Sequence, residues 1–474
     1  MNNLIHCHLA IIGAGSGGLS LAAGASQLGL KVVLVEKGLM GGDCLNYGCI
    51  PSKSLLAAAK ANWQAHHSES LGISSPKKPA NFTKIMQHLK EVIETIAVND
   101  SVKRFESLGV LVIKASGQFI NPTTLAAGTQ EIKAKYFVIA TGSSPATPPI
   151  TGIEQIPFYT NETIFNCTDL PPQLIIIGGG PIGCELAQAF AMLGSKVTLV
   201  EGLTILGNDD PEAVAIVRQS LIETGVTLNE RVTINKISSN DKGTITIHGE
   251  QNGTLLNMEG SHLLIAAGRQ PNINELNCKQ AGIEFNSKGI IVDQRLRTSN
   301  KKIFAIGDVA GKLQFTHVAN DHAGVVLRNI AFKLPAKVKE TAIPWVTYTE
   351  PELAHVGRSE SACKTIGIVY TVLKLDYASN DRAQTDLETT GFIKVIITPK
   401  GTILGVTIVG HQAGELLLPW VMAIREGKTL RSFTDAIVPY PTLSELSKRV
   451  ASQFYTPKLF SSKVKKLVQF LSYF

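Results

Sequence analysis

The chain contains one 28-residue pattern twice, and this internal repeat limits the folds open to it. Residues 9–36 (LAIIGAGSGGLSLAAGASQLGLKVVLVE) align with residues 174–201 (LIIIGGGPIGCELAQAFAMLGSKVTLVE) at a constant offset of 165, without a gap. Each copy passes from an apolar run through a glycine-rich turn into an alanine-rich run, then into a second apolar run that ends in glutamate. This order predicts strand, turn, helix and strand, and therefore an α/β fold with two Rossmann-like domains.

The glycines and the final acid of each copy suit a bound dinucleotide. Three glycines recur at equivalent positions: Gly13, Gly15 and Gly18 in the first copy, and Gly178, Gly180 and Gly183 in the second. In such a turn the first glycine permits the tight bend, the second lets a pyrophosphate approach, and the third lets helix and strand pack closely. The pyrophosphate then lies at the positive end of the helix. Glu36 and Glu201 follow at the spacing at which a carboxylate binds ribose hydroxyls. Two sites predict two dinucleotides.

Composition excludes several other classes of protein. The 45 basic and 38 acidic residues are mostly scattered, so no nucleic-acid partner is expected. Seven cysteines form no regular framework, which favours a reducing, cytoplasmic location over secretion. The uncharged run 9–30 is long enough for a membrane span, but six glycines interrupt it. A buried strand, turn and helix explain that run better.

A close pair of cysteines follows the first repeat. Cys44 and Cys49 lie in GLMGGDCLNYGCIPSKSLL and are separated by four residues, so both thiols can project from one irregular turn at a helix start. That spacing is compatible with a disulfide, and a helix N-terminus lowers the pKa of a thiol. The other cysteines are isolated, so we expect no metal site. The alternative is that Cys44 and Cys49 are two ordinary buried core cysteines. Because the pair lies between two dinucleotide motifs, this alternative is weaker than a redox-active pair.

The segment GGDCLNYGCIPSK resembles the redox-active signature of class I pyridine nucleotide-disulfide oxidoreductases. These are FAD flavoenzymes such as dihydrolipoamide dehydrogenase, glutathione reductase and mercuric reductase. Further segments that resemble the family occur in family order: ATGS (140–143), AAGRQPN (266–272), AIGD (305–308), VTYTEPELAHVG (346–357), NDRAQTD (380–386) and PTLSE (441–445). The resemblance covers essentially the whole chain and implies a homodimeric oxidoreductase.

The resemblance also implies a division into domains. An FAD-binding domain would take residues 1–149 and 269–340, and an NAD(P)-binding domain would be inserted as residues 150–268. A Pro- and Lys-rich connection, LPAKVKE (334–340), precedes a last segment with alternating apolar residues. Residues 341–474 would form an α+β dimerisation domain.

Site residues follow from the same resemblance, motif by motif. The FAD-binding residues would be Gly13, Gly15, Gly18, Glu36, Gly42, Lys53, Gly117, Thr141, Gly142, Ser143, Asp308 and His317. The NAD-binding residues would be Gly178, Gly180, Gly183, Glu201, Val232 and Gly268. Lys53 would contact the flavin and pair with Glu185, where nicotinamide meets flavin.

The implied electron path runs from NADH through FAD to a Cys44–Cys49 disulfide and then to an acceptor. Cys49 would be the sulfur next to the flavin, and Cys44 would attack the acceptor. Because thiolates are the reactive species, both pKa values are expected to be lowered.

The residue Glu201 bears on the choice of nucleotide. Its carboxylate would accept hydrogen bonds from a ribose 2′-hydroxyl and would repel a 2′-phosphate. No Arg or Lys occurs from 202 to 217, so no phosphate clamp is visible. The sequence therefore predicts a preference for NADH over NADPH.

One departure from the family pattern concerns the last domain. Disulfide-reducing members carry a histidine immediately before PTxxE, which acts as acid and base across the dimer. Here Tyr440 occupies that position while Glu445 is retained. The ordinary pKa of tyrosine, about 10, makes it a poorer proton donor and acceptor at neutral pH than histidine at about 6.5. Reduction of lipoamide or glutathione disulfide is therefore expected to be weak.

In having tyrosine at this position, the chain resembles the mercuric reductases. Their substrate is a soft metal ion, whose reduction needs no proton shuttle. This sequence shows no metal-binding segment before its first repeat and no vicinal cysteines in SSKVKKLVQFLSYF, so efficient mercuric reduction is in doubt. The acceptor, a small molecule or a metal ion, stays open. The alternatives are a dihydrolipoamide dehydrogenase-type disulfide reductase and a slow redox sensor.

The last residues form a basic amphipathic pattern. Apolar residues recur at helical spacing, with lysines among them: Phe460, Val464, Leu467, Leu471 and Phe474. Such a helix could pack on the dimer, or it could contact an anionic membrane from the periphery. Both interpretations stay open at this point.

Overall fold

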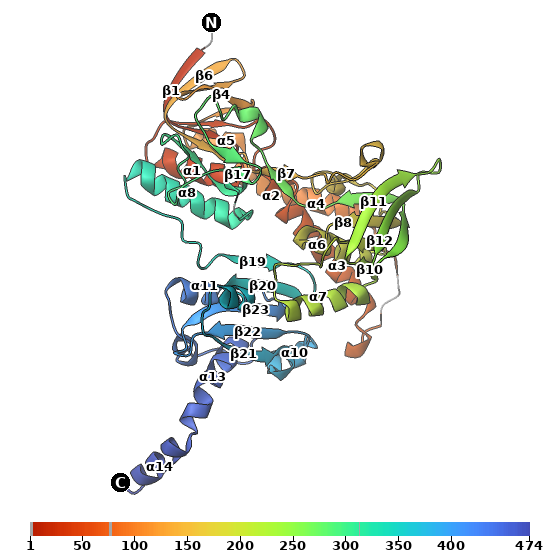
Figure 1. Ribbon diagram of the computed structural model, residues 1–474, viewed down its shortest axis with the longest axis vertical. Coiled ribbons are helices and arrows are strands. Elements are labelled where there is room, and N and C mark those ends of the chain that lie inside the picture. The colour runs from red at the N-terminus through yellow and green to blue at the C-terminus, as the bar shows by residue number, and fades with distance from the viewer. Residues whose placement is uncertain (1–2, 75–77, 312) are drawn as a thin grey trace. The chain divides into compact units, whose positions relative to one another are not determined.

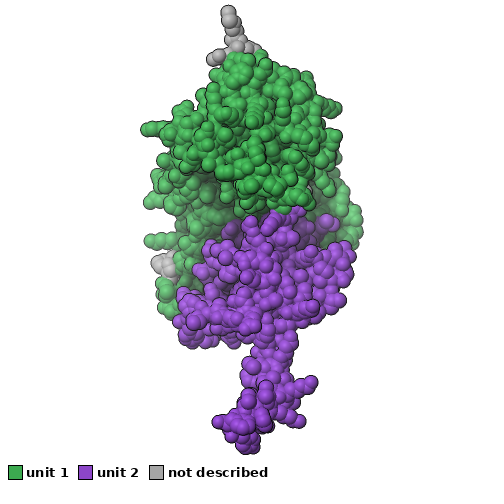
Figure 2. Space-filling view, turned by 90° about the vertical axis from the view of Figure 1, so that its left-hand side faces the viewer, with its two compact units in different colours: residues 1–202, 231–338 green, residues 203–230, 339–474 purple. Residues whose placement is uncertain are grey.

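The computed structural model describes residues 3–74, 78–311 and 313–474, which form two compact units (Figures 1 and 2). One unit comprises Met1–Gly202 and Arg231–Val338, and the other comprises Leu203–Glu230 and Lys339–Phe474. Each contains helices packed on sheets, which confirms the predicted α/β class. Within the described ranges, no helix combines the length and the apolar character needed to cross a bilayer.

The main sheet of the first unit has seven strands and contains the first repeat. In sheet order its strands are β3 (Val110–Ile113), β2 (Val32–Val35), β1 (Asn3–Ile12), β6 (Gln130–Ile139), β5 (Thr124–Ala127) and β4 (Gly117–Asn121), with β18 (Ile303–Ala305) also paired to β6. The strands from β3 to β6, together with β18, are parallel, and β4 and β5 are antiparallel additions. Helix α1 (Ser16–Gln27) packs beside α8 (Thr316–Ala331). The run 9–30 is thus strand, turn and helix, as predicted.

The register of this sheet brings distant motifs together. Ile12 at the end of β1 lies opposite Val35 on one side and Ile139 on the other, and Ile139 also pairs with Ala305. The residues that follow these strands therefore meet at one edge. Ligands of open parallel sheets bind at the carboxyl ends of the strands, so this edge is where a dinucleotide is expected.

The second repeat builds a smaller parallel sheet in the same unit. Strand β8 (Gln173–Ile177) lies between β9 (Lys196–Val200) and β14 (His262–Ile265), and helix α6 (Pro181–Met192) connects β8 to β9. Ile177 pairs with Val200 and Ile265, so Gly178, Glu201 and the turn after β14 share one edge. Both copies of the repeat form the predicted strand, turn, helix and strand.

The remaining elements of the first unit connect these sheets. The helices are α2 (Gly42–Asn46), α3 (Cys49–His66), α4 (Phe82–Ala97) and α5 (Val102–Ser107). The strands are β7 (Ser143–Pro145), β11 (Val232–Ser239), β12 (Ile245–Gln251), β13 (Thr254–Gly260), β15 (Arg269–Pro271), β16 (Phe285–Asn286) and β17 (Gly289–Ile290). Among them, β7 and β15 pair in antiparallel fashion and bring the segments 143–145 and 269–271 together.

The second unit is built on a five-stranded antiparallel sheet. Its strands, in sheet order, are β19 (Pro344–Thr347), β20 (Glu352–Gly357), β23 (Ile403–Gly410), β22 (Phe392–Ile397) and β21 (Thr371–Asp376). Its helices are α7 (Pro211–Glu223), α9 (Glu360–Thr365), α10 (Asp381–Asp386), α11 (Leu418–Arg425), α12 (Arg431–Thr434), α13 (Glu445–Leu459) and α14 (Ser462–Leu471), and β10 (Val226–Asn229) also belongs to it. The core includes the fully buried Trp420, which stacks on Phe433.

Side-chain contacts explain why α7 belongs to the second unit. Asp210 caps α7 by accepting hydrogen bonds from the backbone N–H groups of Glu212 and Ala213. The same carboxylate pairs with Lys394 of β22 at 2.8 Å, and the lysine side chain is only 3% exposed. Lys394 also contacts the carboxylate of Glu212 and lies 3.6 Å from that of Glu360, so several carboxylates compensate this buried ammonium.

The two glycines that open α6 give a matched test of the turn. A Cβ at Gly183 would lie 1.8 Å from the carbonyl oxygen of Gly178, whereas a Cβ at Gly180 would meet no atom of the described residues within 4 Å. We expect Gly183→Ala to cost about 1–3 kcal/mol or more, since backbone must move, and to lower the thermal unfolding temperature. Gly180→Ala should cost less than about 1 kcal/mol and impair nucleotide binding instead. Equal thermal destabilisation of the two variants would contradict this assignment.

Candidate active site

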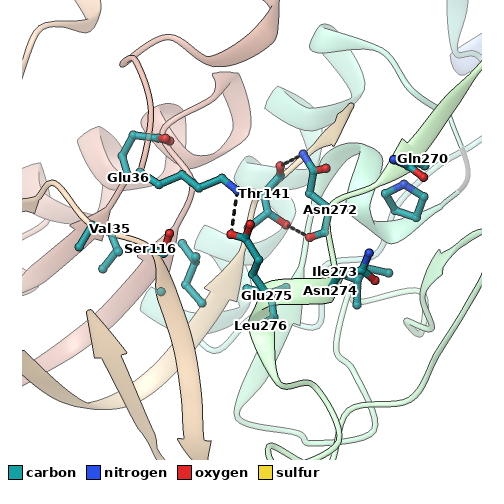
Figure 3. A pocket seen from close by; sticks show the side chains of 16 residues that line it. Val35, Glu36, Ser116, Thr141, Gln270, Asn272, Ile273, Asn274, Glu275 and Leu276 are labelled. Atoms are coloured by element: carbon teal, nitrogen blue, oxygen red, sulfur yellow. Dashed lines mark hydrogen bonds and ion pairs between the residues drawn. The ribbon is translucent and has the colours of Figure 1, made fainter. Parts of the chain in front are cut away.

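A pocket at the carboxyl edge of the main sheet is lined by residues from both halves of the first unit (Figure 3). Gly13, Glu36, Gly117 and Thr141 line it, all of them predicted FAD-binding residues. Glu36, Gly13 and Thr141 follow β2, β1 and β6, which are adjacent in the sheet, so these three residues meet at one edge. Gly117 begins β4, which β5 separates from β6.

Glu36 is held at the entrance to the first glycine turn. One carboxylate oxygen accepts a hydrogen bond from the backbone N–H of Ala14 at 2.6 Å, and the other accepts from Gly38 at 2.6 Å. The carboxylate is thereby fixed beside the positive end of α1, where a ribose hydroxyl can reach it.

The opposite wall of the pocket comes from residues that sequence reasoning did not single out. Thr141 donates to the carbonyl oxygen of Asn272 at 2.7 Å, and the amide of Asn272 donates back to the carbonyl oxygen of Thr141 at 2.9 Å (Figure 3). Lys37 and Glu275 form an ion pair of 2.8 Å at the pocket (Figure 3). Asn272 is the last residue of the family-like segment AAGRQPN, and this segment could have identified it as a site residue.

The glycines fit a bound dinucleotide in the way the pattern requires. A Cβ at Gly18 would lie 1.9 Å from the carbonyl oxygen of Gly13, and a Cβ at Gly42 would lie 2.7 Å from the Cα of Gly15. Among the described residues, the only atom within 4 Å of such a Cβ at Gly15 is the Cα of Gly42, at 3.9 Å. Space is therefore left beside the helix N-terminus where the pyrophosphate of FAD would be held.

A chain of polar contacts links this edge to the cysteine loop. Ser143 donates to Asp308 at 2.6 Å, and Arg269 donates to the hydroxyl of Ser143 at 2.8 Å. Arg269 also pairs with Asp43 at 3.2 Å, and Asn161 donates to the same carboxylate at 3.2 Å. Burial raises the pKa of Asp308. Arg269, Asp43 and Asn161 were not predicted as site residues.

The cysteines face one another across the junction of two helices. Cys44 lies within α2 and Cys49 is the first residue of α3, and both are thiols in the structure. A hydrogen bond from Cys44, with smaller contributions from Thr316 and Lys53, lowers the pKa of Cys49 to about 6. The same hydrogen bond, together with burial, raises the pKa of Cys44. The expectation that both pKa values are lowered is therefore wrong: the first thiolate forms on Cys49 and the proton stays on Cys44.

Beside this pair lies the predicted ion pair of Lys53 and Glu185. Lys53 on α3 contacts Glu185 on α6 at 2.6 Å, and the glutamate side chain is only 6% exposed. This contact joins the helix that carries Cys49 to the helix of the second glycine turn. A buried carboxylate here holds the ammonium in place.

The second glycine turn repeats the arrangement of the first. The carboxylate of Glu201 accepts a hydrogen bond from the backbone N–H of Gly179 at 2.6 Å, and Val232 donates its backbone N–H to the carbonyl oxygen of Glu201. Gly268 ends the same edge with a positive φ of 114°. Glu201 and Glu36 thus stand at equivalent places in the two sheets.

Three further predicted residues are His317, Gly142 and Tyr440. His317 is exposed and its ring stacks on Phe315, with centroids 5.2 Å apart. Gly142 has a positive φ of 66° directly after Thr141. In the second unit Tyr440 is 70% exposed, and its hydroxyl donates to Asp381 at 3.1 Å. That hydrogen bond raises the pKa of Tyr440 further, and Asp381 was not anticipated.

Comparison with known proteins agrees with this geometry. The sequence profile of the pyridine nucleotide-disulphide oxidoreductases matches residues 7–323, and that of their dimerisation domain matches residues 343–451. The chain belongs to the pyridine nucleotide-disulphide oxidoreductase family. The family is FAD-dependent and uses NAD(P)H, and the dimerisation domain supports a homodimer.

The relatives of this oxidoreductase differ in their named activities. A mercuric reductase from Staphylococcus aureus is 34% identical over 451 residues, which are 94% of this chain and 82% of that protein. A dihydrolipoyl dehydrogenase from Geobacillus stearothermophilus is 34% identical over 450 residues, 93% of this chain and 94% of that protein. The solved structure of a Cu(II) complex of the HOCl-induced flavoprotein disulfide reductase RclA from Escherichia coli has a TM-score of 0.85 and 29% identity, covering 96% and 100% of the two chains. The relatives do not decide the acceptor.

The unequal cysteines give a direct test in the reduced enzyme. We expect alkylation of Cys49 by iodoacetamide to rise through a pH of about 6 and to level off above it, because its thiolate is the reactive form. Cys44→Ala removes the hydrogen-bond donor, so this midpoint should move upward toward the ordinary thiol value of about 8.5. Peptide mass spectrometry assigns the alkylated residue. If Cys44 were alkylated first at low pH, or if Cys44→Ala left the midpoint unchanged, the assignment would be reversed.

Proposed function

We propose that the protein is an NADH-dependent flavoenzyme that reduces an acceptor through Cys44 and Cys49 and does not need a proton donor from its dimerisation domain. The observation that carries the proposal is the unequal cysteine pair beside the Lys53–Glu185 ion pair. In the reductive half-reaction a Cys44–Cys49 disulfide takes up the hydride of NADH as two electrons and one proton. Its S–S bond breaks, and the pair becomes a thiolate on Cys49 and a thiol on Cys44. FAD, held by Glu36 and the first glycine turn, would supply the electron relay between nicotinamide and the disulfide.

The residues of the chain have distinct roles in this proposal. Cys49, with the lower pKa, carries the negative charge next to Lys53, whose ammonium stabilises it. Cys44 engages the acceptor after it loses its proton. Glu185 keeps Lys53 oriented at 2.6 Å. Glu36 and the first glycine turn would hold FAD, and Glu201 and the second glycine turn would hold NADH.

The acceptor class follows from the position that Tyr440 occupies. Reduction of a disulfide must protonate a leaving thiolate, and a tyrosine whose pKa is raised by Asp381 is a poor donor for that step. A soft metal ion bound by two thiolates needs no such proton. We therefore favour an acceptor of the metal-ion type, in keeping with the mercuric reductase relatives and the Cu(II) complex of the structural relative. Lipoamide is the alternative that the dihydrolipoyl dehydrogenase relatives support.

A panel of acceptors decides between these possibilities. NADH oxidation is followed with Hg(II) or Cu(II) in excess thiol, quinones, lipoamide, glutathione disulfide and oxygen. We expect turnover with a metal ion and little with either disulfide. Fast reduction of lipoamide would support the dehydrogenase alternative, and negligible turnover with every acceptor would support the slow redox sensor.

Tyr440 gives a matched pair of variants for the same assay. Tyr440→His restores an imidazole before the retained Glu445, so disulfide reduction should rise at least tenfold, within the 10²–10⁴ that acid–base catalysis usually supplies. Tyr440→Phe removes only the hydroxyl and should leave metal-ion reduction unchanged. Reduction of the enzyme by NADH should be equal in both variants. An unchanged disulfide rate in Tyr440→His would mean that substrate binding, and not proton transfer, limits the native protein.

The preference for NADH rests on Glu201. Because its carboxylate repels a 2′-phosphate, the native enzyme should be reduced at a lower concentration of NADH than of NADPH. Glu201→Arg should narrow or reverse this difference, measured as the half-saturating concentrations in anaerobic stopped-flow reduction. Glu201→Gln controls for loss of the hydrogen bond to Gly179, since an amide oxygen can still accept it. Equal behaviour of native protein with both nucleotides would refute this role.

We also propose a cytoplasmic enzyme whose C-terminal segment contacts anionic membrane from the periphery. Residues 446–474 contain six Lys and Arg and no Asp or Glu. Helix α14 has no buried residue, and its apolar side chains Leu467, Val468, Phe470 and Leu471 are more than half exposed. The match to the dimerisation domain ends at residue 451, before α14 begins. Exposed apolar groups flanked by lysines suit a lipid surface of negative charge.

Vesicle sedimentation tests this localisation. The dimer should bind vesicles that contain phosphatidylglycerol and should stay unbound with phosphatidylcholine alone, because each lysine contributes about 1 kcal/mol only at an anionic surface. The combined change Lys463→Glu, Lys465→Glu and Lys466→Glu should abolish binding, while Lys60→Glu on α3 should not. If the triple variant instead dissociated the dimer, the tail would be a dimer contact.

A further inference from the structure

Three side chains with metal-binding atoms meet in the second unit, away from the cysteine pair in the sequence. Glu350 follows β19, Glu388 follows α10, and His411 follows β23. Their ligand atoms all lie within 4.8 Å of one another, and each residue is partly buried. None of the three belongs to the residues that we assign to nucleotides or to electron transfer.

The sheet fixes this meeting point. Glu352 of β20 pairs with Gly410 of β23, so the residues on either side, Glu350 and His411, come close. The hydroxyl of Tyr377 donates to the carbonyl oxygen of His411 at 3.1 Å. A Cβ at position 410 would lie 2.4 Å from the ring of Tyr377, so glycine is required there. The backbone that presents His411 is thus held on both sides.

The separation of His411 from Glu350 suits two ligands of one ion and is too long for a direct hydrogen bond. Nδ1 of His411 lies 3.7 Å from a carboxylate oxygen of Glu350, and this buried nitrogen makes no hydrogen bond among the described residues. A hydrogen bond would require about 2.7–3.2 Å. Two ligands that are each about 2.0–2.2 Å from one zinc ion lie about 3–4 Å apart, which includes the observed separation.

The charge of the surroundings also favours a cation. Glu350 and Glu388 each bring a carboxylate oxygen within 4.8 Å of an imidazole nitrogen of His411. The carboxylate of Glu352 accepts a hydrogen bond from the backbone N–H of Gly414 at 2.9 Å, which holds it beside the cluster. Several carboxylates in a partly buried place repel one another unless a positive charge lies among them.

We propose that Glu350, Glu388 and His411 form a binding site for a divalent transition-metal ion of the zinc type. One imidazole nitrogen and two carboxylate oxygens suit zinc and its neighbours, whereas magnesium and calcium prefer oxygen ligands alone. Three protein ligands leave one position for water. The ion would connect three segments of the dimerisation domain, so its binding should stabilise the folded state.

The binding experiment uses the full-length, FAD-loaded protein with Cys44→Ser and Cys49→Ser, so that the redox thiols cannot bind zinc. Equilibrium dialysis against Zn²⁺ near neutral pH, followed by metal analysis, should give one ion per chain. Glu388→Gln, which keeps the shape of the side chain, and His411→Ala should each weaken binding at least tenfold, in line with the loss of a ligand. His88→Ala, at an exposed position of α4, is the control and should bind like the parent.

Thermal unfolding supplies a second measurement. Zn²⁺ should raise the unfolding temperature of the parent and of His88→Ala, and should have no effect on His411→Ala. Mg²⁺ at the same concentration should have none on any variant. Zinc binding of equal strength in all variants, or no binding by the parent, would overturn the proposal, because an ion pair between Glu350 and a protonated His411 would then account for the cluster. If Mg²⁺ stabilised the parent as much as Zn²⁺ does, the proposed selectivity for a transition-metal ion would be refuted.

Discussion

The structure depends on a contact between two stretches of backbone that occurs once in each repeat. At the first turn the Cα of Gly18 faces the carbonyl oxygen of Gly13, and at the second Gly183 faces Gly178, so closely that no Cβ fits between. This contact lets the helix start directly above the carboxyl end of its strand. This contact also positions the rest of each repeat. The strand after the helix pairs in parallel with the first strand, and the carboxylate of Glu36 or Glu201 then accepts a hydrogen bond from the backbone of the glycine turn.

The same geometry explains why the redox site can be assembled from distant segments. Parallel strands end at one edge, so Ser143 after β6 and Asp308 after β18 are neighbours although 165 positions separate them. The short pairing of β7 with β15 adds Arg269, which reaches Asp43 next to Cys44. The cysteine loop is therefore attached to the dinucleotide edge by charged groups.

Local patterns predicted the features that depend on local geometry. The glycine spacing fixes a turn wherever it occurs, so both repeats and the helix of the C-terminal segment could be derived from the sequence. Contacts between loops could not be predicted from the sequence, because they join residues at no regular spacing. The pairing of Arg269 with Asp43, the bond from Tyr440 to Asp381 and the cluster of Glu350, Glu388 and His411 all join residues whose separation follows no motif. The opposite pKa shifts of Cys44 and Cys49 depend on which thiol donates a hydrogen bond to the other, and this follows from their three-dimensional arrangement and not from their spacing in the sequence.

The distribution of protons links the cysteines to the acceptor. With one thiolate on Cys49 and one proton on Cys44, the reduced pair holds a single proton that must leave before both sulfurs can bind one acceptor. In a disulfide exchange that proton, or another, must return to the leaving sulfur, and an acid of suitable pKa is needed. Tyr440 does not meet this requirement, because its hydrogen bond to Asp381 favours the protonated phenol. With a thiophilic metal ion the proton leaves once, and the positive charge of the metal lowers the pKa of the thiol it binds. This distribution of protons is the physical basis of the proposal that the acceptor is a metal ion.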